Sequence, residues 1–228
     1  MFCHSCGTQV PSDVAFCPNC GQSLAAPVTP SGPAFVARGE IKATPGKWIG
    51  MGWELVKADI SNAVLMTLLF IVIAGVPFIG GALIAGFHYW FQKKLMGLRG
   101  DFGDLFKGFN FFIPTLVASL LIGLFTGIGA CLCIIPGLVV AAAFKFTYLF
   151  IVDKRMDFWP AMMASHEVVK NDYFGFTMFL LLTVLVNLLG ALCCIVGLLV
   201  SIPVTFAAIT IAYQELVGFD SSTPSRVG

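Results

Sequence analysis

Charged side chains are scarce in this sequence of 228 residues. Asp, Glu, Lys and Arg make up 11% of the chain, whereas a soluble globular domain carries roughly 25%. Hydrophobic residues account for 58%, and the mean hydropathy is +0.92. This composition excludes an ordinary soluble protein and predicts an integral membrane protein whose main partner is the lipid bilayer.

Lys and Arg are absent from the first 37 positions, and the net charge of the whole chain is only +1. Without a positive field, we do not expect a nucleic-acid partner. We expect no secretory signal, because the first long apolar run begins near residue 60. A Ser/His/Asp set, a Gly-rich phosphate loop and a catalytic carboxylate pair are also missing, so the sequence does not predict an enzyme.

Cysteine is concentrated at the start of the chain. Two Cys-x-x-Cys pairs, each followed by Gly, stand ten residues apart. This spacing lets both thiolates of one turn reach a single ion, and the glycine permits the backbone angle that such a turn needs. Since so small a unit cannot fold on a hydrophobic core alone, we predict a zinc ribbon over residues 1–21. Its structural Zn²⁺ would be held by Cys3, Cys6, Cys17 and Cys20. A disulfide framework, typical of secreted chains, is the alternative.

Composition divides the rest of the chain into three regions. Residues 22–47 are rich in Ala, Pro, Ser, Thr and Gly, which predicts a flexible linker. Residues 48–219 hold nearly all the hydrophobicity and form the predicted membrane domain. Residues 220–228 are polar, and we expect them to be a disordered tail.

Three long runs, residues 60–92, 108–144 and 173–214, contain no Lys, Arg, Asp or Glu. A spanning helix needs about 20 apolar residues, so the second and third runs each suffice for two crossings. The first run is long enough for either one crossing or two short ones. Turn chemistry interrupts each run near its middle. These interruptions lie at residues 75–81, 131–137 and 193–197.

A short polar pattern precedes each run: an acidic residue, two apolar residues and a lysine. It reads ELVK at 54–57, DLFK at 104–107 and EVVK at 167–170. Residues three apart on a helix are neighbours, so each acid and lysine can pair at the water boundary. If each pattern introduces one helical hairpin, the domain is all-α, with six transmembrane helices in three tandem hairpins.

Basic residues set the predicted orientation. Apart from Lys145, they lie in the polar patterns, in the two longer loops and near the termini, whereas the three mid-run turns are uncharged. By the positive-inside rule, the loops and both termini face the cytoplasm. The cysteines at positions 131, 133, 193 and 194 then lie on the outer side, either as free thiols or as a disulfide between hairpins.

Lys145 is the one Lys, Arg, Asp or Glu placed deep in a predicted span. An ammonium there costs at least about 2.5 to 3.5 kcal/mol on insertion scales. It either binds an anionic ligand, or it snorkels or makes a structural hydrogen bond. His88, beside Tyr89 and Trp90, is expected in an interfacial aromatic belt, and Asn187 in a hydrogen bond between helices.

Two helix faces are expected to make close contacts. Ser119, Gly123 and Gly127 form a stripe of small residues, which we expect to admit a neighbouring helix of the same chain. Residues 157–172 are expected to form an amphipathic helix on the membrane surface, capped by Asp157. Its lipid-facing residues would be Trp159, Met162 and Met163.

Two resemblances add to this interpretation. The head, with FCPNCG at 16–21, resembles the short zinc ribbons at the N-termini of many bacterial membrane proteins. The remainder resembles a group of bacterial membrane proteins that carry an Ile-Pro-Gly turn, an Asp one helix later and an Ala-x-x-x-Ser segment. In this sequence these are IIPG at 134–137, Asp153 and AMMAS at 161–165. The chain is also similar to the membrane domain attached to some glycerophosphodiester phosphodiesterases, but their catalytic domain is absent, so no activity is implied.

These observations favour a membrane adaptor or scaffold in the bacterial inner membrane. Its cytoplasmic zinc ribbon would recruit or sense a cytoplasmic protein partner. The alternative is a small transporter or lipid-handling protein in which Lys145 meets an anionic ligand.

Overall fold

The computed structural model describes residues 41–75, 78–132, 134–193, 196–220 and 223. Contacts divide the chain into two units, Met1–Ala34 and Phe35–Gly228. The predicted zinc ribbon and most of the predicted linker lie outside the described residues. All of the described residues belong to the second unit.

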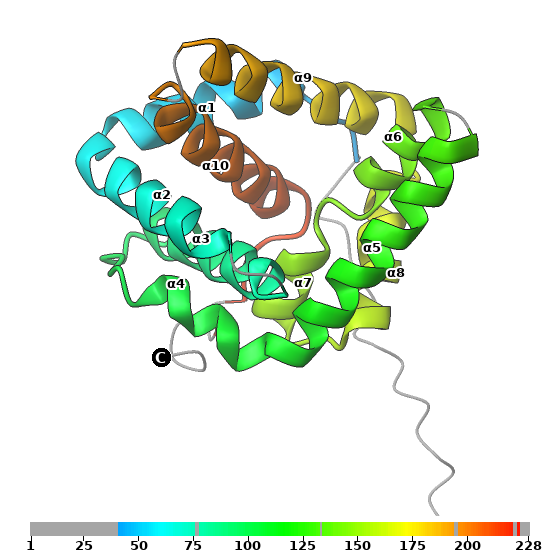
Figure 1. Cartoon of the computed structure of the whole chain (residues 1–228), viewed down its shortest axis with the longest axis horizontal. Helices are drawn as coiled ribbons and strands as arrows, with labels where there is room; N and C mark the ends of the chain where they lie inside the picture. Colours follow the sequence, from blue (N-terminus) through cyan, green and yellow to red (C-terminus); the bar gives the residue numbers. More distant parts are fainter. Residues whose placement is uncertain (1–40, 76–77, 133, 194–195, 221–222, 224–228) are drawn as a thin grey trace, which may run out of the picture. The chain divides into compact units, whose positions relative to one another are not determined.

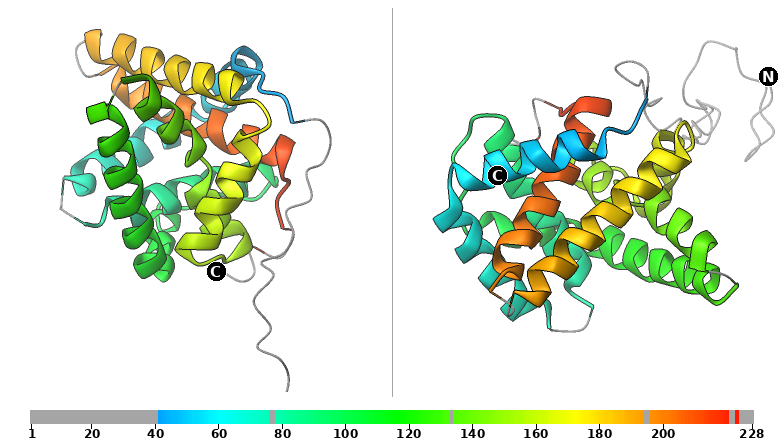
Figure 2. Two further views of the ribbon diagram at one scale, coloured as in Figure 1. Left: turned by 90° about the vertical axis from the view of Figure 1, so that its right-hand side faces the viewer. Right: turned by 90° about the horizontal axis from the view of Figure 1, so that it is seen from above.

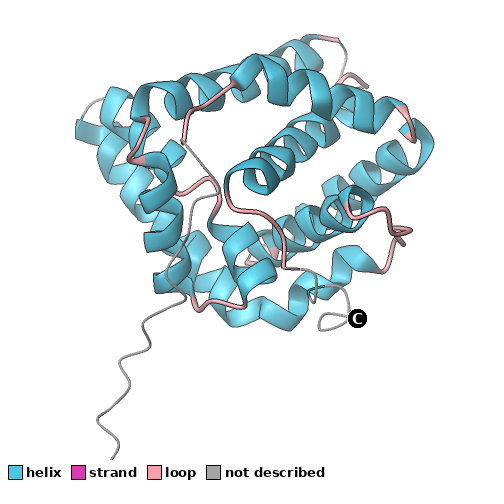
Figure 3. Cartoon of the chain, turned by 180° about the vertical axis from the view of Figure 1, so that it is seen from behind, coloured by secondary structure: helices cyan, strands magenta, loops and turns pink. Residues whose placement is uncertain are grey.

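Every regular element in the described residues is a helix or a helical turn (Figure 3). This confirms the all-α prediction for that part of the chain. The elements are α1 (Pro45–Lys57), α2 (Ile60–Ala74), α3 (Gly80–Leu95), α4 (Asp104–Lys107), a 3₁₀ turn η1 (Gly108–Phe111), α5 (Phe112–Leu132), α6 (Ile134–Ala143), α7 (Thr147–Lys154), α8 (Phe158–Val169), α9 (Tyr173–Leu192) and α10 (Leu198–Leu216). The predicted interruptions coincide with the junctions α2/α3, α5/α6 and α9/α10.

Four helical stretches are long and apolar enough to cross a membrane, which indicates a multi-pass membrane protein. They are Asp104–Cys131, Ile134–Lys154, Tyr173–Leu192 and Leu198–Leu216. A fifth arises if α1 and α2, which meet at 101°, form one broken span.

The prediction of six crossings therefore exceeds what the described helices offer, and the difference lies in the first hairpin. Helix α3 has 16 residues, which rise about 24 Å at 1.5 Å per residue, short of a hydrocarbon core about 30 Å thick. Most of its residues are buried inside the protein. The first run thus supplies an interior helix where the sequence predicts a sixth crossing.

The three polar patterns form the predicted ion pairs. Glu54 and Lys57 lie 3.9 Å apart at the end of α1, and Asp104 and Lys107 lie 3.4 Å apart in α4. The third pair, at the end of α8, joins Glu167 and Lys170. Each pattern is followed by the next long helix, as the tandem-hairpin interpretation requires.

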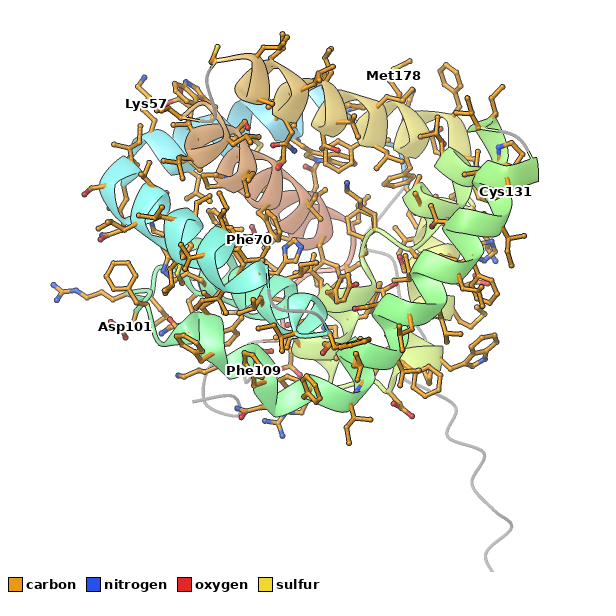
Figure 4. All side chains as sticks on the ribbon, in the orientation of Figure 1. Lys57, Phe70, Asp101, Phe109, Cys131 and Met178 are labelled. Carbon is orange, nitrogen blue, oxygen red and sulfur yellow. The ribbon has the colours of Figure 1, made fainter. Side chains whose placement is uncertain are left out.

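Helix α10 is the most enclosed of the candidate spans. In its apolar window 61% of residues are buried, against 11% in the window of the stretch Asp104–Cys131. It lies against α1, α9, α2 and α3, while α5 and α6 run side by side (Figures 1 and 2). Phe70 of α2 packs on Phe87 of α3 and Phe206 of α10, whereas Met178 of α9 is half-exposed on the outside (Figure 4).

Glycines bring α5 and α6 together, but they are not the predicted ones. A Cβ placed on Gly137 would lie 2.8 Å from the backbone nitrogen of Ala130, and one on Gly129 would lie 3.0 Å from the Cα of Gly137. A Cβ on Gly123 or Gly127 would meet nothing within 4 Å. The predicted small-residue contact is therefore wrong at these two glycines, because they face away from the rest of the domain.

Helix α8 begins and is capped as predicted. The Asp157 side chain accepts a hydrogen bond of 2.8 Å from the backbone N–H of Phe158. Trp159 and Met163 are exposed, but Met162 is fully buried. The lipid-facing assignment of Met162 is therefore wrong, because its side chain belongs to the core face of the helix.

We predict that Gly137→Ala destabilises the domain by about 1 to 3 kcal/mol, the usual effect of overpacking. The added methyl group would press on the backbone of Ala130, which cannot move aside as a side chain does. The measurement is unfolding by sodium dodecyl sulfate in mixed micelles. Gly123→Ala is the matched control and should be neutral or slightly stabilising; equal losses in both variants would contradict the assigned contact.

Candidate ligand site

The span that carries Lys145 is broken at that residue. Helix α6 ends at Ala143 and α7 begins at Thr147, although together they form one apolar stretch. At the break the backbone hydrogen bonds change from the α-helical i to i−4 pattern to an i to i−3 pattern. Lys145 N–H donates to the carbonyl of Ala142 and Thr147 N–H to that of Phe144, each three residues back. The break therefore leaves Ala143 O and Phe146 N–H without their usual helical partners.

Ser165 of α8 satisfies both of these groups. Its hydroxyl donates to the carbonyl of Ala143 at 2.7 Å and accepts from the N–H of Phe146 at 3.1 Å. Ser165 is fully buried. Because an unpaired backbone group inside a membrane costs several kcal/mol, this one side chain makes the break tolerable.

Lys145 projects from the break toward α9. Its Nζ donates to the hydroxyl of Thr183 at 3.2 Å, and that hydroxyl donates in turn to the carbonyl of Leu180 at 2.7 Å. Among the described residues, no carboxylate forms an ion pair with Lys145. An ammonium has three N–H donors, so the Thr183 bond leaves it with donors to offer a ligand.

A cavity of about 300 Å³ opens in front of Lys145. Its walls come from α3, α5, α6, α7, α9 and α10, and they are apolar apart from a few convergent polar groups. Such a lining is typical of small-molecule sites. The residues are Ile84, His88, Ile122, Ala141, Phe144, Lys145, Tyr148, Leu180, Thr183, Asn187, Thr205, Phe206 and Ile209.

His88 lies in this cavity, so the expected place in an interfacial belt is wrong. The side chain is 3% exposed, and its Nδ1 lies 2.9 Å from the hydroxyl of Thr210. Since that hydroxyl already donates to the carbonyl of Phe206, we assign the proton to Nδ1 of His88. The hydrogen bond to Thr210 of α10 holds the imidazole in the interior, and the sequence does not reveal this contact because the two residues are far apart along the chain.

Asn187 forms the predicted hydrogen bond between helices. Its Nδ2 donates to the hydroxyl of Thr205 at 3.3 Å, and its Oδ1 accepts from Ser201 at 3.0 Å. Nδ2 also donates to the carbonyl of Thr183 within α9. This α9–α10 bridge, made of Asn187, Ser201 and Thr205, closes one wall of the cavity.

A second polar centre surrounds Asp153 and does not include Lys145. The buried carboxylate accepts from Gln92, Tyr213 and Thr223 and from the backbone N–H of Asp220. The ammonium of Lys154 lies 3.1 Å away. Two residues of the segment expected as a disordered tail therefore contact the membrane domain, and Asp153 has enough partners without Lys145.

The cysteines fall into two sets. Cys3, Cys6, Cys17 and Cys20 lie outside the described residues. In the part that the structure describes, no group of three or more His, Cys, Asp or Glu side chains could hold a metal. Cys131 and Cys193 are free and exposed, which supports free thiols over a disulfide at these two positions.

Sequence reasoning missed the break and the role of Ser165. The available signal was the pair of polar residues at i and i+4 on each of two apolar helices: Thr183 and Asn187 on α9, Ser201 and Thr205 on α10. Matching polar stripes on apolar helices indicate a shared interior. For Ser165 the Ala-x-x-x-Ser resemblance marked the residue without indicating what it contacts.

Comparison with known proteins supports the zinc-ribbon prediction. Residues 2–24 match the zinc-ribbon domain family. An uncharacterized protein of Mycobacterium bovis is 36% identical over 103 residues, which are 45% of this chain and 32% of that protein, and two uncharacterized proteins of Mycobacterium tuberculosis match over the same extent. The chain thus spans about a third of the length of the curated relatives it matches.

No solved structure matches this chain. Nothing in the comparisons supports the resemblance to the membrane domain of glycerophosphodiester phosphodiesterases.

We predict that Ser165→Ala destabilises the domain by about 2 to 4 kcal/mol, because two backbone groups lose their partner inside the membrane. Unfolding by sodium dodecyl sulfate measures the loss. Ser61→Ala, at an exposed position of α2, should change stability little. If the two variants are equally stable, the Ser165 hydroxyl does not support the break.

Proposed function

We propose that the membrane domain binds an anionic ligand at Lys145, as a small transporter or lipid-handling protein would. The observation that carries this proposal is the placement of Lys145 on a broken span, facing a cavity of about 300 Å³, with Thr183 as its hydrogen-bond partner. Broken membrane helices are used at substrate sites because their irregular backbone lines a cavity. The proposed role is binding and not chemical conversion.

Electrostatics supports an anion over other ligands. Lys145 is the one Lys or Arg among the described residues that line the cavity, and that lining contains no Asp or Glu. A desolvated ammonium gains most from a charge-assisted hydrogen bond. The observed contact with Thr183 is the structural alternative, yet a single neutral hydroxyl compensates an ammonium poorly.

We predict that Lys145→Met removes the bound anion. Loss of one charge-assisted hydrogen bond, about 1.5 to 3 kcal/mol, lowers affinity roughly ten- to a hundredfold. Native mass spectrometry of the full chain, extracted gently from its membrane, would compare retained anions in wild type and variant. Lys57→Met, at an exposed lysine of α1, is the control. Equal retention by wild type and Lys145→Met would refute the proposal.

The zinc ribbon supports a second proposed role, recruitment or sensing of a cytoplasmic protein partner. The family match covers residues 2–24, and the four cysteines within it supply the thiolate set of a closed structural zinc site. Cys3, Cys6, Cys17 and Cys20 would hold the ion, which stabilises the small unit when bound. With four thiolate ligands the zinc ion has no free coordination position for catalysis, so we propose that it holds the ribbon in the shape that contacts a protein partner.

Location follows from the same considerations. We propose the bacterial inner membrane, with both termini in the cytoplasm, where thiolates stay reduced and available for zinc. Support comes from the bacterial relatives and from the charge distribution between the loops and the mid-run turns.

We predict one zinc ion per chain, lost in Cys17→Ser together with any captured partner, while membrane insertion is kept. Elemental analysis of the purified protein measures the metal, and affinity capture followed by mass spectrometry measures the partner. Cys193→Ser, at a free exposed thiol, is the control and should retain both. Full zinc content in Cys17→Ser would contradict the ligand assignment, and undiminished capture would contradict the adaptor role.

A further inference from the structure

A second hollow lies on the far side of the α9–α10 bridge. This groove, of about 430 Å³, is bordered by α1, α9 and α10 and is almost entirely apolar. Its residues are Ile49, Trp53, Val186, Leu189, Gly190, Cys193, Gly197, Val200, Ser201 and Val204. On α10 the groove positions (197–204) come before the cavity positions (205–209), and on α9 most of them come after, so the groove lies nearer the α9/α10 turn than the Lys145 cavity does.

The two hollows share one wall. Asn187 and Thr205 face the Lys145 cavity, whereas Ser201 faces the groove, and hydrogen bonds join Asn187 to both hydroxyls. Toward the α9/α10 turn the helices close tightly, since a Cβ on Gly190 would press on the Ser201 hydroxyl and lie 3.0 Å from the carbonyl of Gly197. The wall between the hollows therefore consists of the hydrogen-bonded side chains of Asn187, Ser201 and Thr205, which we call the seam. Next to it, on the side of the α9/α10 turn, Gly190 packs closely against Ser201 and Gly197.

We infer that the ligand of Lys145 is a monoanionic amphiphile whose hydrocarbon chain crosses this seam and lies in the apolar groove. The inference rests on the proposed function and names the ligand class. One cationic side chain among the described lining residues matches one negative charge, such as a carboxylate or a phosphodiester. The chain belongs in the groove because that surface offers almost no polar partner and is bordered by α9 and α10, which are apolar enough to span a membrane.

The groove is suited to hydrocarbon and not to a protein segment. Leu189, on its rim, is 54% exposed, and the neighbouring outer positions of α9 are exposed leucines and Val184, a surface suited to lipid. An amphiphile entering from the bilayer would thus pass from lipid to groove to cavity without exposing its chain to water. For the chain to cross the seam, the hydrogen bonds from Asn187 to Ser201 and Thr205 must first break.

Cys193 provides a built-in reporter. This free, exposed thiol borders the groove, whereas Cys131, also free and exposed, lies at the end of α5 and is not among the groove residues. A chain in the groove should protect Cys193 from alkylation and leave Cys131 unchanged. Site-resolved mass spectrometry would read each thiol separately.

The experiment places the full chain in phosphatidylcholine nanodiscs, with or without added palmitate or phosphatidylglycerol, and measures alkylation by N-ethylmaleimide. We expect slower modification of Cys193 by about tenfold, the scale of one charge-assisted bond, with Cys131 unaffected. The protection should vanish in Lys145→Met and persist in Lys57→Met. Protection by palmitate identifies a carboxylate ligand, and protection by phosphatidylglycerol a phosphodiester.

Native mass spectrometry of the same samples separates the two proposals. Lys145-dependent binding without protection of Cys193 would overturn the groove assignment and leave anion binding intact. Protection that persists in Lys145→Met would also overturn it, because the chain would then occupy the groove without its anionic group at Lys145. If neither amphiphile binds in a Lys145-dependent way, the amphiphile inference falls, whereas the proposed function falls only if wild type and Lys145→Met also retain the same anions.

Discussion

The arrangement of the ligand site depends on the two hydrogen bonds that the Ser165 hydroxyl makes to the backbone at the break between α6 and α7. A helix in hydrocarbon must satisfy its own backbone, and a break is tolerated only where another group takes over. Here one side chain both donates to Ala143 O and accepts from Phe146 N–H. The resulting kink places the Lys145 side chain in the interior cavity, where it contacts Thr183. Helix α8 thereby positions Lys145 although it lines no part of the cavity.

Two centres of polar residues lie in the interior of the domain. One contains Lys145, Thr183, Asn187 and His88, and the other is built on Asp153. The Asp153 centre is fully supplied with donors and ties the C-terminal segment to α7. The Lys145 centre has a surplus of donors and an adjacent cavity. The Asp153 carboxylate thus has the donors it needs, whereas the Lys145 ammonium has donors left over, and this contrast is the physical reason to place function at Lys145.

Local chemistry made much of the fold predictable. Gly and Pro located the junctions between long helices, and the acid-x-x-Lys spacing located three ion pairs, because both depend on residues within one turn. The number of crossings was not predictable in this way. The run over 60–92 lacks charge because α3 is buried in the protein, and a sequence does not distinguish burial in protein from burial in lipid.

Contacts between distant residues account for the other differences. Gly123 and Gly127 show where a helix could approach, whereas the actual approach uses Gly129 and Gly137. His88 turns inward because Thr210 accepts its Nδ1–H, 122 residues away in sequence. Of the candidate site, Lys145 and Asn187 were identifiable as polar residues in apolar spans, but the cavity that makes Lys145 accessible comes from six helices that only tertiary packing unites.

The central claim is that the Lys145 ammonium meets the anionic group of a ligand. Rotational-echo NMR on nanodiscs with ¹⁵Nζ-labelled lysine and carboxyl-¹³C palmitate measures that contact directly. The account predicts dephasing from a separation of about 4 Å, the range of a close ion pair, present in wild type and absent in Lys145→Met. In nanodiscs in which palmitate binds, dephasing that is absent in wild type, or that survives in Lys145→Met, would contradict it.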